Sequence, residues 1–226
     1  MSIARRIAKN TTWLYGAEVI GKILQFFLII TLARHYGAEI FGQYSFAMTF
    51  TLIFSMFVDL GMGVLIIREI SKNRASTPKY LKNILFIKLV LAFVSFFLLV
   101  VVINILNYPK DVTLLVYAFG IYNSLMQIVE FFKAILKAHE HMFSDSIIKV
   151  FEKVITVGVS LVLIYLGYSI KIIALVFLFS AICTVLMSIA IISKSVSKFT
   201  ANLDTHFIKR FLRASITFAL LLVFYT

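Results

Sequence analysis

Most of this 226-residue chain consists of long apolar runs that short polar connections separate. Each run has about 23 to 27 residues, and at about 1.5 Å per residue a helix of that length crosses the hydrocarbon core of a bilayer. Hydrophobic residues make up 62% of the chain, more than a soluble core of this size can hide. The sequence therefore predicts an all-α, polytopic membrane helix bundle with six spans, at residues 11–33, 41–67, 84–106, 112–136, 144–166 and 170–192.

Lysine and arginine lie mainly on one side of these predicted spans. The side that includes the N-terminus carries fifteen of them, and the opposite side carries three, Arg34, Lys110 and Lys171. The positive-inside rule then predicts a multi-pass protein of the cell membrane with a cytoplasmic N-terminus. The net charge of +12 is explained by topology and by contact with anionic membrane lipids, so no nucleic-acid partner is expected.

A basic amphipathic segment occurs twice in the chain. FIKRFLRAS at 207–215 has the pattern of IARRIAKNT at 3–11, which favours a parallel repeat of six spans, although any helix entering from a basic side has similar flanks. Residues 214–226 are too few to cross a bilayer. We therefore expect residues 1–193 to form a six-helix N-terminal lobe, and 194–226 a cytoplasmic connection and a truncated seventh helix.

Polar side chains recur at helical spacing inside four of the predicted spans. A charge that faces lipid costs several kcal/mol, so these residues should face a cavity or one another. At about 1.5 Å per residue the carboxylates lie roughly 9 to 12 Å inside the cytoplasmic face, which predicts a polar vestibule there. The candidate cavity residues are Glu18, Lys22, Gln25, Asp59, Asn123, Gln127, Glu130, Lys149 and Glu152.

The stretch GAEIFGQYSFAMTFTLIFSMFVDLGMGVLIIREIS, residues 37–71, combines a Gly-rich turn, a D-L-G end and an R-E pair. It resembles the first loop and second helix of polysaccharide (Wzx-type) flippases of the multidrug/oligosaccharidyl-lipid/polysaccharide (MOP) superfamily. Residues 131–164, with Glu140 and Glu152, resemble the connection between the fourth and fifth helices of that family. The motif positions are Gly37, Phe41, Gly42, Tyr44, Asp59, Leu60, Gly61, Arg68 and Glu69.

The resemblance implies the N-terminal half of a two-lobed transporter. Such a protein carries a lipid-linked oligosaccharide to the outer leaflet by alternating access, in the synthesis of surface polysaccharide. Lysines in its vestibule would meet phosphate, and amide or hydroxyl groups would meet sugar hydroxyls. A missing C-terminal lobe is then an expected partner.

Several residues keep two interpretations. Glu18 with Lys22, and Lys149 with Glu152, form either structural ion pairs or substrate and coupling sites. Asp59 with Gly61, Arg68 and Glu69 favours a cytoplasmic gate or packing motif over a proton carrier. Lys88 is expected to snorkel toward the cytoplasmic interface. The sequence His139-Glu140-His141 is expected to be a solvated loop and not a metal site.

Catalytic signatures are missing from the sequence. It has no phosphate-cradling Gly loop, nucleophile elbow or metal-ligand cluster, so no enzymatic activity, cofactor or metal is predicted. Two alternatives to the flippase stay open: a multidrug or cation-coupled exporter of the same superfamily, and a non-transporting membrane interaction protein.

Overall fold

The computed structural model describes residues 3–196 and 202–225, and this part of the chain is helical without strands. Side chains are described for residues 11–196 and 202–217, so the basic side chains of Arg5, Arg6, Lys9 and Lys198 lie outside the described part. The elements are α1 (Ile3–Asp59), α2 (Met62–Lys72), the 3-10 turn η1 (Arg74–Ser76), α3 (Thr77–Ile105), α4 (Lys110–Ala138), α5 (Met142–Tyr165), α6 (Ile170–Ser195) and α7 (Thr205–Tyr225).

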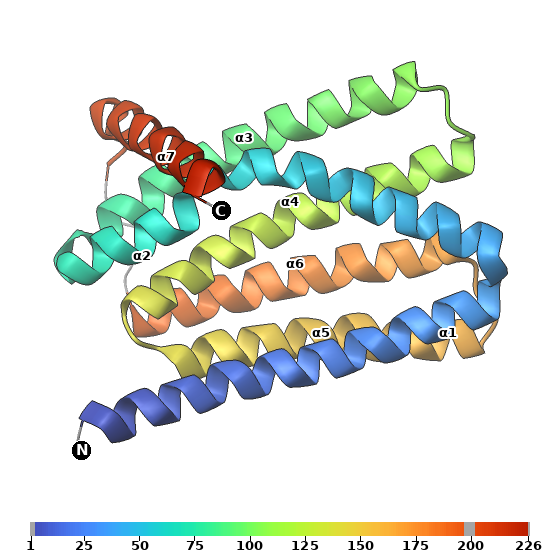
Figure 1. The fold of residues 1–226 in the computed structure, drawn as a ribbon, viewed down its shortest axis with the longest axis horizontal. Coiled ribbons are helices and arrows are strands. Elements are labelled where there is room, and N and C mark those ends of the chain that lie inside the picture. Colours follow the sequence, from blue (N-terminus) through green and yellow to red (C-terminus); the bar gives the residue numbers. More distant parts are fainter. Residues whose placement is uncertain (1–2, 197–201, 226) are drawn as a thin grey trace.

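The long helix α1 bends back on itself at Gly37 (Figure 1). Gly37 has φ 75° and ψ 177°, a backbone conformation that glycine adopts without a Cβ clash. The turn predicted between the first two apolar runs is therefore a kink, and α1 consists of two antiparallel arms. The predicted boundaries of the later helices are close, except that α3 begins at Thr77, about two turns before residue 84.

A second break interrupts the run that the sequence predicts as one helix over 41–67. Leu60 and Gly61 both have positive φ, 45° and 72°, and α2 starts anew at Met62. The prediction of one continuous helix over 41–67 is wrong here, because a hydropathy pattern contains no information about the backbone conformation of single residues. Two neighbouring contacts fix the break: Lys88 binds Asp59 at 2.9 Å, and the Ser215 hydroxyl donates to the Leu60 carbonyl at 2.6 Å.

Substituting Gly61 by alanine tests this break. The left-handed conformation costs a residue with a Cβ about 1–2 kcal/mol, so Gly61→Ala should lower the free energy of unfolding by that amount. Gly63→Ala is the matched control, since its added Cβ would come no closer than 3.9 Å to any atom. Denaturant unfolding in detergent micelles measures both variants, and equal effects would contradict the assigned role of Gly61.

Helix α4 is the centre of the bundle and contacts α1, α2, α3, α5 and α6. Two apolar clusters surround it. One includes Leu28, Tyr44 and Phe119 toward the Gly37 end, and the other includes Met62 and Phe131 toward α2. Polar residues separate the two clusters along the helices, and they include Thr51, Ser95, Asn123, Glu152 and Thr184, all of them buried.

Four helical stretches of the described chain are long and apolar enough to cross a membrane: Thr11–Lys72, Arg74–Ile105, Lys110–Ala138 and Ile170–Ser195. The predicted span at 144–166 is not among them, and α5 carries Asp145, Lys149, Glu152 and Lys153. The connections from α2 to α3 and from α4 to α5, which the positive-inside rule places on the basic side, lie at one end of the bundle, together with the start of α1, α2 and the start of α7 (Figure 1).

Candidate functional site

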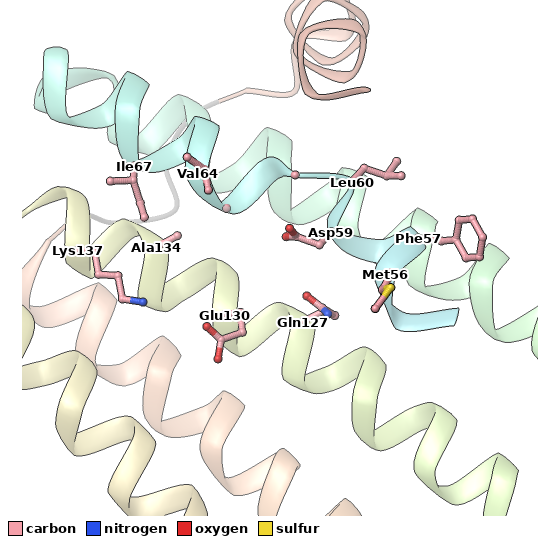
Figure 2. Close-up of a pocket in the computed structure, with 12 residues that line it drawn as sticks. Met56, Phe57, Asp59, Leu60, Val64, Ile67, Gln127, Glu130, Ala134 and Lys137 are labelled. Carbon is pink, nitrogen blue, oxygen red and sulfur yellow. The ribbon is translucent and has the colours of Figure 1, made fainter. Parts of the chain in front are cut away.

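An open hollow of about 640 Å³ lies between the end of α1, the start of α2 and the adjoining face of α4. Figure 2 shows Gln127, Glu130 and Lys137 along α4, across from Asp59 and the α1–α2 break. Four of the predicted site residues line it: Asp59, Gly61, Gln127 and Glu130. The rest of its wall is mainly apolar, from Met56, Phe57, Leu60, Gly63, Val64, Ile67 and Ala134.

Asp59 is held by a lysine from α3. The Nζ of Lys88 lies 2.9 Å from Asp59 Oδ1 and also donates to the carbonyl of Val58 at 3.4 Å. The Lys88 side chain is completely buried, whereas that of Asp59 is 33% exposed. The expectation that Lys88 snorkels to the interface is therefore wrong, because the Asp59 carboxylate and the negative C-terminal end of α1 stabilise its charge inside the bundle.

The α4 face of the hollow carries both signs of charge. Glu130, half exposed, accepts a hydrogen bond from Lys133 at 2.6 Å. One turn further, Lys137 lies 4.0 Å from the buried carboxylate of Asp145 on α5. The Asp145 Oδ1 atom has no hydrogen-bond partner in the described structure. The positive charge of Lys137, at this edge of the hollow, is thus only weakly neutralised by Asp145.

Sequence reasoning assigns Lys133 and Lys137 only to the topology count. In the structure Lys137 lines the hollow, and Lys133 binds Glu130, which also lines it. Because α4 remains helical to Ala138, the three residues are neighbours at helical spacing. That spacing is visible in the sequence and could have identified them.

A second charge cluster joins the first arm of α1 to α5. Lys149 donates to Glu18, and Lys22 approaches the same carboxylate at 3.8 Å. Lys149 is bonded to Glu18 and not to Glu152, so the suggested pair of Lys149 with Glu152 is replaced by a pair between two helices. Lys22 has the most exposed side chain of the three, at 77%.

Two residues predicted to line the cavity instead form hydrogen bonds that link one helix to another. Asn123 is buried and donates to the Thr51 hydroxyl at 2.8 Å, which ties α4 to the second arm of α1. Glu152 is also buried, accepts from the Tyr122 hydroxyl at 3.0 Å and lies 3.3 Å from Lys153 Nζ. Gln25 is half-buried on α1 and does not line the hollow between α1, α2 and α4.

The remaining gate candidates lie on another surface. Arg68 and Glu69 line a hollow of about 440 Å³ between α2, α3 and α7, and Glu69 pairs with Lys72 at 3.0 Å. Gly61 and the pair Arg68–Glu69 therefore lie in two separate hollows on α2, and the structure does not bring them together.

The connection between α4 and α5 is a partly exposed loop, as expected, but it also contacts η1 and the start of α3. His139 Nε2 lies 2.8 Å from the Thr77 hydroxyl, and Arg74 binds Glu140 at 2.7 Å. Burial lowers the pKa of His139 below its usual value, and the nearby Arg74 charge adds to that effect. No group of three His, Cys, Asp or Glu able to hold a metal occurs among the residues that the structure describes.

A family model described as polysaccharide biosynthesis protein matches residues 7–226. The chain belongs to the polysaccharide biosynthesis protein family. The resemblance of the sequence to polysaccharide flippases is thereby confirmed, and the chain is a membrane-embedded protein of polysaccharide biosynthesis with a transport role. No curated protein and no solved structure matches it.

Membership of this family bears on what the hollow between α1, α2 and α4 can bind. Members are in general transporters and not enzymes. The charges of Asp59, Glu130 and Lys137 line an open hollow in an apolar bundle, and their side chains are partly exposed, so they are accessible to a polar group that enters it. Such an arrangement suits reversible binding of a polar group during its passage through a membrane.

Proposed function

We propose that this chain acts in a membrane flippase that moves a lipid-linked oligosaccharide from the cytoplasmic to the outer leaflet by alternating access. In this proposal the protein lies in the cell membrane, its N-terminus is cytoplasmic, and six spans form an N-terminal lobe followed by the start of a seventh helix. The observation that carries the proposal is the charged hollow of about 640 Å³ inside an apolar bundle.

The residues of the hollow match the chemistry of such a substrate. Lys137 offers a cation whose nearest carboxylate is 4.0 Å away, and a diphosphate oxygen would be a closer partner. Gln127 and Glu130 offer amide and carboxylate groups that bind sugar hydroxyls. Asp59, fixed by Lys88, would hold the α1–α2 break in position as the cytoplasmic edge of the vestibule.

The exposed charges of α1 support a second lobe. Glu18 and Lys22 lie about two and three turns inside the first apolar run, yet their side chains are 44% and 77% exposed. Charges at this depth are costly against lipid, so another protein surface or a water-filled cavity should cover them. We propose that a C-terminal lobe covers this face and completes the transport pathway.

The carboxylates Asp59 and Glu130 in the hollow favour one alternative, a cation-coupled exporter of hydrophobic cations from the same superfamily. The two proposals differ in the sign of the transported charge. An exporter of cations would depend on the carboxylates alone, whereas a carrier of a diphosphate lipid would depend on Lys137 as well.

A vesicle assay separates these proposals. Vesicles containing the intact protein and a fluorescent polyprenyl-diphosphate oligosaccharide report flipping as the fraction that an external reagent quenches. Lys137→Met should reduce the rate about tenfold or more through loss of one charge-assisted contact. Lys171→Met, at the opposite end of the bundle, is the matched control. Flipping that is unaffected by Lys137→Met, with export of a cationic dye lost in Glu130→Gln, would favour the exporter instead.

A further inference from the structure

The first turns of α7 carry a row of basic side chains that the hollow between α1, α2 and α4 does not use. His206, Lys209, Arg210 and Arg213 recur at i, i+3, i+4 and i+7, so they share one face of the helix. All four are exposed, and together they line a hollow of about 590 Å³. We call these four residues the basic stripe of α7.

The opposite face of α7 is fixed to the bundle. Phe207 and Phe211 meet the ring of Tyr80 on α3 edge-on, at centroid distances of 5.0 and 5.8 Å. Ser215 is fully buried and donates to the carbonyl of Leu60 at 2.6 Å. With about 100° per residue, Ser215 lies roughly 180° around the helix from His206, so His206 and Arg213 are directed away from α2 and α3. Arg210 lies at the edge of the stripe and also lines the hollow between α2, α3 and α7.

The basic stripe has no carboxylate partner in the described part of the chain. Asp204, one turn earlier, is already used, because it binds Lys79 at 2.7 Å and accepts from the backbone N–H of Phe207 at 2.9 Å. The bond from Lys79 lowers the pKa of Asp204, which keeps that carboxylate ionised and engaged. Glu69 is paired with Lys72. Among the residues that the structure describes, Lys209, Arg210 and Arg213 therefore form no ion pair with a carboxylate, although Arg210 shares a hollow with Glu69.

We propose that the basic stripe of α7 binds the phosphate groups of anionic phospholipids at the membrane surface. The helix leads from a polar connection into the apolar sequence ITFALLLVF, which places the stripe at the level of lipid head groups. Arginine binds phosphate through two parallel N–H donors, and lysine adds a point charge. Since the stripe lines a hollow separate from the one between α1, α2 and α4, bilayer phospholipid and not the transported lipid is its ligand.

Lipid binding at this stripe has a consequence for the hollow. The same helix turn that holds the head group presents Ser215 to Leu60, the residue with φ 45° at the α1–α2 break. An anionic lipid that anchors α7 therefore also stabilises the break that forms one wall of the hollow. The site is independent of which molecule the protein transports.

Titration of short-chain phosphatidylglycerol into the detergent-solubilised protein, with phosphatidylcholine as reference, tests the proposal. The variant Lys209→Gln/Arg210→Gln/Arg213→Gln should lose affinity for phosphatidylglycerol about fivefold per removed cation, or about 100-fold in all. Lys82→Gln/Lys110→Gln/Lys194→Gln removes the same charge elsewhere and should bind as the unaltered protein does. The charge-keeping variant Lys209→Arg/Arg210→Lys/Arg213→Lys should retain binding, which excludes misfolding as the cause of the loss.

Other results would overturn the proposal. Equal loss of affinity in both triple-glutamine variants would show a general charge effect and no site. If the stripe variant kept phosphatidylglycerol and lost polyprenyl diphosphate, the stripe would serve the transported lipid. Because lipid binding is measured without transport, a protein that binds phosphatidylglycerol through the stripe but fails to flip an oligosaccharide would refute the proposed function alone.

Discussion

Asp59→Ala is expected to produce one of the largest losses of stability in this protein. It leaves the ammonium group of Lys88 in a completely buried position with only the Val58 carbonyl, 3.4 Å away, as acceptor. Removal of one partner from a buried ion pair costs about 3–5 kcal/mol, because the remaining charge has lost both water and its counter-ion. Unfolding of the purified protein in detergent by heat or denaturant measures the difference.

The companion variants make the prediction specific. Lys88→Met leaves Asp59, whose side chain is 33% exposed and reaches solvent, so its loss should be smaller, about 1–3 kcal/mol. The double variant Lys88→Met/Asp59→Ala should recover most of the stability lost in Asp59→Ala. Equal losses in both single variants, or additive losses in the double variant, would show that the two residues act independently.

Lys22→Met is expected to reduce oligosaccharide flipping with little change in stability. Its side chain is 77% exposed and lies 3.8 Å from Glu18, so it contributes little to holding α1 and α5 together. An exposed ammonium beside a transport pathway is free to bind phosphate, and loss of such a contact corresponds to about a 10- to 100-fold lower rate. The flipping assay and a parallel unfolding curve measure the two effects.

Lys149→Met should behave differently from Lys22→Met. Lys149 is 25% exposed and is bonded to Glu18 across the α1–α5 contact, so its removal should lower stability and transport together. The prediction for Lys22 fails if both variants keep full transport, or if Lys22→Met destabilises the protein as much as Lys149→Met does. Lys171→Met again serves as a control at the far end of the bundle.

Much of the architecture follows from the local sequence. The apolar runs have the length of membrane spans, and the turn at Gly37 and the basic entry into α7 are each encoded within a few neighbouring residues. Helical spacing correctly groups Gln127 with Glu130 on one side of α4, and both line the same hollow. Spacing within a helix is fixed by backbone geometry, so sequence alone is sufficient for these statements.

Partners that lie on different helices could not be assigned in this way. Glu18 pairs with Lys149, Asp59 with Lys88, and Glu152 with Tyr122, and in each pair the two residues are at least 29 positions apart. The expected local pair of Lys149 with Glu152 does not form. A carboxylate inside a bundle binds the donor that packing brings nearest, and for Glu152 this is the Tyr122 hydroxyl.

The chain by itself thus determined that this is a helical membrane protein, that its first two apolar runs are separated by a turn at Gly37, and which faces of its helices are polar, because hydropathy and helical periodicity act over short distances. Only the tertiary structure decided that the predicted second span breaks at Leu60–Gly61, that Lys88 is buried, and that Asn123 and Glu152 join helices instead of lining a cavity. The physical reason is that burial and ionic partnership depend on which helices meet, and that is settled by packing across the whole bundle.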